Sequence, residues 1–320
     1  MAGAFLSQRR PIWVKWLSYE NHLALLKQRG LTVGDPEQAK RLLQHIGYYR
    51  LSEYLRYWQK NPEYGDNTFV GGASFMDICA VHEAEARLAD VTMVALRRIE
   101  PLLRAQFADT FSEVISPYAL LTDKAAFTPP PSRSSGPTAQ EALLRDLNRS
   151  KEAFVSRYRD NSERNERGEY KPEAYAQTPA WVAVQACSFG TLSRCLEASG
   201  SNTVRDIVAD RIHTGHSQIA SQVKSLVYLR NWCAHSARIW NHSCLEAPPL
   251  TGKVAAHLKK RYRTFNDRSA YKTLSLIHLL LASNSYCEDW LGEQIEPILQ
   301  GNDLLACGIT APQKYQDFTP

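Results

Sequence analysis

The sequence lacks the short motifs of several common enzyme classes. It contains no G-x-x-x-x-G-K-[ST] loop, no G-x-G-x-x-G turn and no G-x-S-x-G elbow. These absences disfavour nucleotide hydrolysis and acyl transfer. His213 and His216 have a spacing that could suit a metal, but no cluster of Cys, Asp or Glu lies nearby to complete four ligands. We therefore expect a turn or a cap at these histidines, and a protein without a metal or other cofactor.

The sequence also lacks paired cysteines and long apolar runs. Its seven cysteines include no C-x-x-C pair, so they are typical of reduced cytosolic thiols that mostly pack in a core. Residues 1–10 lack the apolar stretch of a signal peptide, and residues 274–282 form a run far too short to span a membrane. We expect a cytoplasmic protein with no membrane partner.

What the sequence does contain is a mild excess of positive charge and extensive helical periodicity. The formal net charge is +5 over 320 residues. Such a surface would tolerate a polyanion, although many basic proteins bind none. Apolar residues recur at helical spacing along most of the chain. The sequence therefore predicts an all-α fold.

Caps and breakers predict where single helices begin and end. Ser18 should cap a helix that stops at Gly30, and a second helix should run from Asp35-Pro36 to Gly47. Further helices are expected over residues 75–111, 139–158, from about 218 through the block at 229–241, and 274–290. Pro101 should kink the first of these or divide it in two. Gly190 should break one helix, and Thr191 should cap the next. The aromatic residues of segment 48–58 could stack on unpaired bases, but packing between helices is favoured.

These patterns divide the chain into five regions. We expect a helical extension over residues 1–75, the first long helices of a bundle over 76–127, a Pro-rich loop and charged insertion over 128–178, the bundle core over 179–300, and a tail over 301–320.

Residues 229–241 are the most informative stretch, because as a helix they sort polar and apolar side chains onto opposite sides. At about 100° per residue, the polar side chains fall within about 140° of arc from Arg230. They are Asn231, His235, Arg238, Asn241 and His242. Apolar side chains fill the opposite side. This pattern is more typical of an active site than of packing alone.

These residue types suit the cleavage of an RNA phosphodiester without a metal. An imidazole can take or give a proton near neutral pH, and a guanidinium offers paired donors to phosphate oxygens. His235 would be the general base or acid, Arg230 would stabilise the phosphorane, and Asn231 would hold His235 or the scissile phosphate. Arg238, Asn241 and His242 would extend the same surface. The alternative is that His235 caps a helix or bridges two helices.

The spacing of the two main residues predicts a second subunit. Arg230 and His235 are five residues apart, which on an ideal helix separates them by about 140°. A two-fold axis beside this face would place a second arginine and histidine opposite the first pair. We therefore expect a homodimer.

Two other groups of charged residues have candidate roles. Glu100 and Arg104 lie one helical turn apart, so they could form a surface ion pair, or Glu100 could orient an arginine of the polar face. The densest basic region contains Lys259, Lys260, Arg261 and Arg263. It could hold the RNA backbone or be a solvated helix face, and the residues leave both interpretations open.

The polar block resembles a known family. Arg230-Asn231-x-x-x-His235 is similar to the R-x4-H signature of HEPN ribonucleases, and residues 229–241 resemble the "LRNxxAHxxRxWN" block of Abi-like proteins of the AbiD/AbiF type, bacterial abortive-infection proteins. Three further matches occur in family order, at residues 47–54, 98–104 and 179–193. Residues 82–88 depart from the family's usual "YxFDxxLR", so no role is carried over to them.

The resemblance implies a fold and an activity. It implies an all-helical HEPN-type bundle, usually dimeric, whose paired R-x4-H motifs cut RNA without a metal in antiphage defence. It also leaves alternatives: a non-catalytic RNA-binding or interaction module, or a toxin controlled by an antitoxin protein or small RNA.

Overall fold

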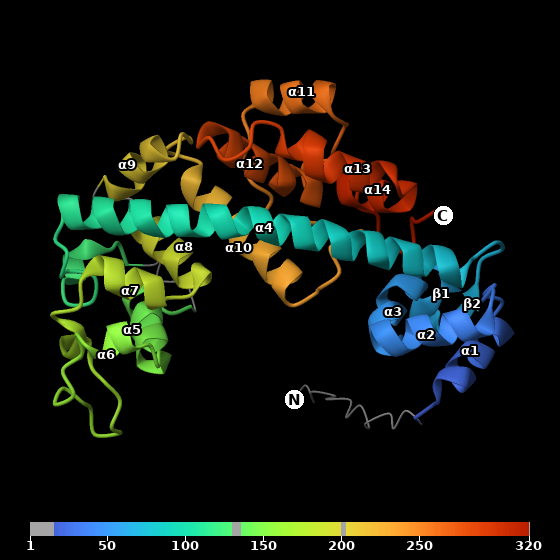
Figure 1. The fold of residues 1–320 in the computed structure, drawn as a ribbon, viewed down its shortest axis with the longest axis horizontal. Helices are drawn as coiled ribbons and strands as arrows, with labels where there is room; N and C mark the ends of the chain where they lie inside the picture. Colours follow the sequence, from blue (N-terminus) through green and yellow to red (C-terminus); the bar gives the residue numbers. More distant parts are fainter. Residues whose placement is uncertain (1–15, 130–135, 200–202, 320) are drawn as a thin grey trace, which may run out of the picture. The chain divides into compact units, whose positions relative to one another are not determined.

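The chain is mostly helical. The computed structural model describes residues 16–129, 136–199 and 203–319. The chain divides into two compact units, a smaller one within residues 1–83 and 314–320 and a larger one within residues 84–313. Among the described residues, the strands form one two-stranded sheet and helices make up nearly all other regular structure (Figure 1). The predicted all-α class is confirmed.

The smaller unit consists of short helices and one hairpin. Its elements are α1 (Tyr19–Gln28), α2 (Pro36–Ile46), α3 (Tyr48–Leu55), β1 (Gln59–Asn61), β2 (Asp66–Phe69) and the first turns of α4 (Phe75–Val114). Short 3-10 turns cover Arg56–Trp58 and Pro62–Tyr64. β1 and β2 are antiparallel, with Gln59 opposite Phe69 and Asn61 opposite Asp66.

Capping residues set the ends of α1 and α2. The Ser18 side chain accepts a hydrogen bond from the Asn21 N–H at 3.3 Å, and Asp35 accepts one from the Glu37 N–H at 3.2 Å. Gly47 follows α2 with φ of 84°, a conformation that glycine adopts without a steric penalty. The predicted caps and the predicted stop at Gly47 are confirmed.

The aromatic segment at residues 48–58 mostly packs inside the smaller unit. Tyr54, Tyr57 and Trp58 are buried, and the ring of Phe318 lies edge-on to Trp58, with 4.9 Å between centroids. Tyr49 differs, because 85% of it is exposed. The packing interpretation of this segment is therefore confirmed.

The larger unit contains the rest of α4 and the helices after it. They are α5 (Ala139–Arg149), α6 (Ala153–Ser156), α7 (Ala180–Ala186), α8 (Phe189–Ala198), α9 (Val204–Arg211), α10 (Ile219–Ala234), α11 (Gly252–Arg261), α12 (Ala270–Ser283), a π-helical turn (Leu291–Ile295), α13 (Glu296–Gln300) and α14 (Asp303–Thr310). Short 3-10 turns cover Lys124–Ala126 and Pro172–Tyr175. α10 packs against α8 and α12, so apolar residues cover much of its surface.

α4 is continuous through its proline. The helix runs from Phe75 to Val114 with Pro101 inside it, so Pro101 does not divide it in two. The other predicted outcome, a kink at Pro101, stays a prediction. Proline removes one backbone hydrogen bond. Buried side chains on both sides of Pro101, including Ile99 and Leu103, hold the helix together, because tertiary packing supplies most helical stability in proteins.

The charged region after residue 128 is more deeply packed than the sequence predicted. The helix expected over residues 139–158 ends at Arg149, and α6 is a separate short helix. Ala142 and Leu147 of α5 are fully buried, where α5 packs against α7 and α8. Residues 130–135, which form most of the expected Pro-rich loop, lie outside the described residues.

The last part of the chain also differs from expectation. α12 ends at Ser283 instead of continuing to residue 290. The expected tail at residues 301–320 contains α14, in which Leu305 and Ile309 are fully buried.

The cysteines and apolar helices are consistent with a packed core. All seven cysteines are free thiols, and five are buried. Within the described ranges, no helix is both long and apolar enough to cross a membrane. Residues 1–10, where a signal peptide was judged absent, lie outside the described residues.

Candidate functional site

The polar block does not form one continuous helix. α10 ends at Ala234, and Ser236 follows with φ of 49°. The Ser236 N–H donates to the Cys233 carbonyl at 3.2 Å and the Ala237 N–H to the Trp232 carbonyl at 2.8 Å. These two bonds form a Schellman motif, in which a serine occupies the left-handed position that glycine usually takes.

A buried carboxylate fixes the chain after this turn. Glu85 on α4 is 4% exposed, and its Oε1 accepts hydrogen bonds from the backbone N–H groups of Ile239 and Trp240. The Trp240 indole donates to the Leu304 carbonyl at 2.7 Å, and a Cβ added at Gly308 would collide with its ring. Sequence reasoning missed Glu85. The sequence did contain a sign of its burial, because Glu85 lies three residues before Leu88 and therefore on the apolar side of α4.

Because the helix ends at Ala234, the remaining polar residues of the block lie after the helix, where they contact neighbouring parts of the chain. The Arg238 guanidinium donates to the Trp240 carbonyl. Asn241 is 7% exposed, and its Oδ1 accepts from the Gln313 N–H at 3.0 Å. His242 packs edge-on against Trp232, with 4.0 Å between ring centroids. The prediction that Arg238, Asn241 and His242 extend one helical face is therefore wrong.

His235 lies at the boundary between helix and turn. It is the C-cap residue of α10, and its backbone N–H donates to the Asn231 carbonyl at 2.9 Å. Its side chain is exposed, as are its neighbours Ala234 and Ser236. A ligand can therefore reach the imidazole.

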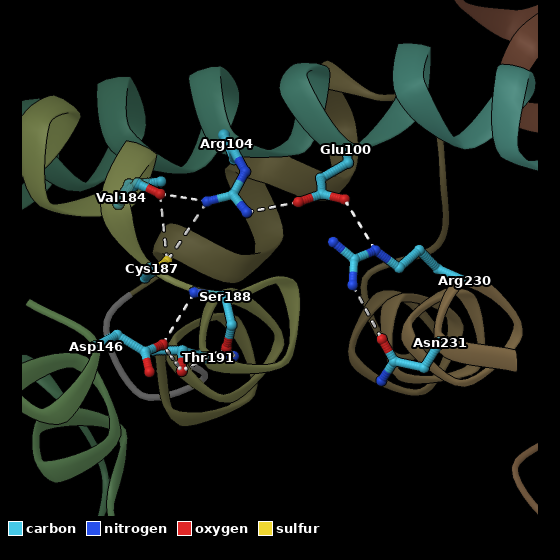
Figure 2. A network of polar contacts seen from close by, with 9 residues as sticks. All are labelled: Glu100, Arg104, Asp146, Val184, Cys187, Ser188, Thr191, Arg230 and Asn231. Atoms are coloured by element: carbon cyan, nitrogen blue, oxygen red, sulfur yellow. Dashed lines mark hydrogen bonds and ion pairs between the residues drawn. The ribbon is translucent and has the colours of Figure 1, made fainter. Parts of the chain in front are cut away.

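Figure 2 shows how Arg230 is held. Its Nη1 donates to Asn231 Oδ1 at 3.2 Å, and its Nε lies 3.7 Å from Glu100 Oε2. The other oxygen of Glu100 accepts from Arg104 Nη2 at 2.5 Å. Side-chain exposure falls from 34% at Arg230 to 17% at Glu100 and 10% at Arg104. Glu100 thus forms the expected ion pair with Arg104, although the pair is mostly buried and not on the surface, and it contacts an arginine of the polar face; that Glu100 orients this arginine stays a prediction.

Arg104 is fastened to the core beneath this pair. It donates to the Val184 carbonyl and approaches the Cys187 sulfur at 3.6 Å. Burial raises the pKa of the Cys187 thiol to about 11, so this sulfur stays protonated and donates to the Val184 carbonyl at 3.2 Å. The two guanidiniums and one carboxylate therefore leave one net positive charge near Arg230.

The start of α8 is fixed by a residue from α5. Asp146 accepts from the Ser188 N–H at 2.9 Å and from the Thr191 hydroxyl at 2.6 Å (Figure 2). Ser188 caps α8, while Gly190 and Thr191 lie in its first turn. The predicted break at Gly190 and cap at Thr191 are wrong, because the Ser188 hydroxyl already accepts from the Thr191 N–H at 3.1 Å.

Several cations of the basic segment have internal partners. Arg263 donates from Nε to both Glu296 oxygens, at 3.0 and 2.9 Å, and from Nη2 to one at 2.5 Å. Arg261 pairs with Asp289 at 3.1 Å. Lys259 lies over the Phe265 ring, 4.9 Å from its centroid, and Lys260 is exposed. Arg263 thus serves the fold.

The histidine pair at 213 and 216 lies in a turn, as predicted. His213 has φ of 59°, and His216 Nε2 lies 2.6 Å from Asp210 Oδ1, a pairing that raises the pKa of His216. In the part of the chain that the structure describes, no three His, Cys, Asp or Glu side chains are grouped to hold a metal ion.

Comparison with known protein families matches residues 41–241 to the family described as Abi-like protein. The chain belongs to that family. The match begins in α2 and ends at Asn241, so it includes Glu100, Arg230 and His235 and excludes the basic segment. Membership suggests a part in abortive-infection defence. No curated protein and no solved structure matches the chain.

Proposed function

We propose that this protein is a metal-independent endoribonuclease of antiphage abortive infection. The observation that carries the proposal is the end of α10. There an exposed imidazole, His235, follows the guanidinium of Arg230, which Glu100 and Asn231 hold in place. Family membership supports the biological setting, and the chemistry of these side chains supports the reaction.

The reaction needs three functions that these residues can supply. A base removes the proton of the ribose 2′-OH, which attacks its own phosphate, and an acid protonates the 5′ oxygen as the P–O5′ bond breaks. A fixed cation stabilises the charge that grows on the phosphorane oxygens. His235 supplies base or acid, and Arg230 supplies the cation. The side-chain oxygen of Asn231 accepts from the Arg230 guanidinium, and in this proposal Asn231 also holds His235 or the scissile phosphate.

The active unit in this proposal is a homodimer. Five residues separate Arg230 from His235, so an ideal helix turns them about 140° apart. Two copies related by a two-fold axis would place the histidine of one beside the arginine of the other. Mixing His235→Ala and Arg230→Ala proteins should then restore part of the activity. A stable monomer that cuts RNA would rule out this shared site.

The experiment that tests the proposal is RNA cleavage in EDTA. The expected products carry 2′,3′-cyclic phosphate or 3′-phosphate ends, because the 2′-OH is the nucleophile, and DNA of the same sequence should resist. His235→Ala should lower the cleavage rate by about 100-fold or more. His45→Ala is the matched control, because His45 is also an exposed histidine but lies on α2.

Three results would overturn the proposal. A strict requirement for Mg²⁺ or Mn²⁺, or cleavage of DNA at a similar rate, would exclude attack by the 2′-OH. RNA binding that is never followed by cleavage would make the protein an RNA-binding module.

A further inference from the structure

A cavity opens beside the end of α10. Its volume is about 140 Å³, whereas a single water needs only about 10–15 Å³ on the same measure. Ser225, Tyr228, Leu229 and Trp232 of α10, residues 242 and 244–246 of the following loop, and Thr273 of α12 line it. It belongs entirely to the larger unit. The cavity therefore has room for a ligand larger than water.

Aromatic rings form much of the wall. Trp232 lies between Tyr228, at 6.5 Å between centroids, and His242, at 4.0 Å. Tyr228 is 44% exposed, so part of its surface is accessible to a ligand. Burial, with the nearby charge of Arg238, lowers the pKa of His242, so at neutral pH its uncharged ring can donate one hydrogen bond and accept another.

The proposed catalytic histidine does not line the cavity, but helical spacing relates it to two residues of the wall. Tyr228, Trp232 and His235 follow one another at spacings of four and three residues, which places them on one side of α10. His235 is about one turn beyond Trp232 along the axis. A flat group stacked on Tyr228 and packed against Trp232 would therefore lie next to whatever His235 contacts.

One lining residue of the cavity carries a charge. Glu246 lines the cavity and pairs at 3.1 Å with Lys224, which is not a lining residue, and both side chains are more than a third exposed. A carboxylate accepts hydrogen bonds from the amino group of a base, and an ammonium pairs with a phosphate. This ion pair thus offers a partner to each polar part of a nucleotide.

We propose that this cavity binds one unpaired base of the RNA substrate, stacked on Tyr228 and inclined to Trp232, whose ring plane is tilted by 58° from that of Tyr228, beside the phosphate that His235 serves. This inference rests on the proposed function, with single-stranded RNA as the substrate, and adds the site at which one base of that RNA binds. Proteins recognise single-stranded RNA by stacking splayed bases on aromatic rings. A paired base is held within its duplex and cannot enter.

The test uses RNA binding by full-length protein that carries His235→Ala, so that the probe is not cut. The probe is a single-stranded RNA containing 2-aminopurine, whose fluorescence is quenched when the base stacks. Tyr228→Ala should weaken binding by about tenfold and remove the quench, since stacking on one aromatic ring contributes that much affinity. Tyr118→Ala is the matched control, because Tyr118 is 46% exposed and lies outside the cavity.

Glu246→Gln tests the charged residue of the cavity independently of the rings. It keeps the side-chain shape and removes the charge, so binding of oligocytidine, whose bases carry an amino group, should weaken severalfold while binding of oligouridine stays the same. Duplex RNA should bind equally to the Tyr228→Ala and Tyr118→Ala proteins. Equal binding of single-stranded RNA by these two variants would overturn the proposal.

The outcomes separate this inference from the proposed function. If the wild-type protein cuts RNA and Tyr228→Ala behaves like Tyr118→Ala, the cavity assignment fails and the nuclease stands. If binding depends on Tyr228 but nothing is cut, the nuclease fails and the base site stands. If Tyr228→Ala instead converts a dimer to a monomer in sedimentation, the cavity is a protein contact and the assignment is overturned.

Discussion

Arginines in two regions of the larger unit have opposite surroundings. In the basic segment, Arg263 is bound by three hydrogen bonds to Glu296 and is 23% exposed. At the end of α10, Arg230 has a carboxylate 3.7 Å away and stays 34% exposed. The first arginine is used by the fold, while the second keeps part of its surface exposed. The density of positive charge in a sequence therefore does not show which arginines remain accessible.

The strongest test of this comparison is Glu296→Ala. Removing the carboxylate leaves Arg263 without its partner and takes an acceptor from the Tyr271 hydroxyl, which donates to it at 2.6 Å. The free energy of unfolding should fall by about 3 kcal/mol, as when one member of a buried ion pair is removed. Urea unfolding measures it. Arg261→Ala is the control, with a change within about 0.5 kcal/mol because Arg261 is 52% exposed.

The second prediction is that substitution of Arg230 lowers activity and leaves stability nearly unchanged, unlike substitution of Glu296. Arg230→Ala should lower RNA cleavage by about 100-fold, because a fixed cation acts on charge that develops in the transition state. Its free energy of unfolding should change little. Arg261→Ala should cost only a few-fold in cleavage, and less at high salt. Comparable losses in cleavage for both variants would mean that the basic segment, and not the end of α10, holds the reacting phosphate.

Glu100 connects the buried and the exposed arginine, so its charge should act through Arg230. Glu100→Gln should lower kcat for RNA by about tenfold, because a small misplacement of Arg230 weakens a contact made in the transition state. KM should change less. Glu113→Gln is the control on the same helix, since Glu113 is 66% exposed and pairs with Arg211. A loss of stability with unchanged kcat would make Glu100 a structural residue only.

Local chemistry made much of the fold predictable. Caps such as Ser18 and Asp35 act within three residues, so a single sequence shows them. The sequence singled out Arg230 and His235 for a similar reason, because the two residues are only five positions apart at the end of α10.

Interactions between distant segments were not predictable in this way. Glu85 accepts from residues 154 and 155 positions later in the chain. α5 is buried against α7 and α8, which come after a charged stretch in the sequence. Because that burial depends on later helices, the charged composition around α5 suggested a solvated insertion. The sequence did not predict the end of α10 because no glycine marks it. The residue in the left-handed conformation that ends the helix is Ser236, with φ of 49°.

The smallest predicted effect concerns this turn, which places His235 next to the solvent. A serine in the left-handed region is strained, since its Cβ crowds the backbone, and glycine removes the strain. Relief of this strain in Ser236→Gly should therefore raise the free energy of unfolding by about 0.5–1 kcal/mol. The larger conformational entropy of glycine in the unfolded state opposes this gain and makes the net increase smaller. Ser243→Gly is the control of opposite sign, because Ser243 is exposed and is not among the residues with positive φ. Thermal unfolding of both variants decides the matter. A loss of stability in Ser236→Gly would mean that the serine side chain supports the turn, and unchanged cleavage would show that His235 does not depend on the strain.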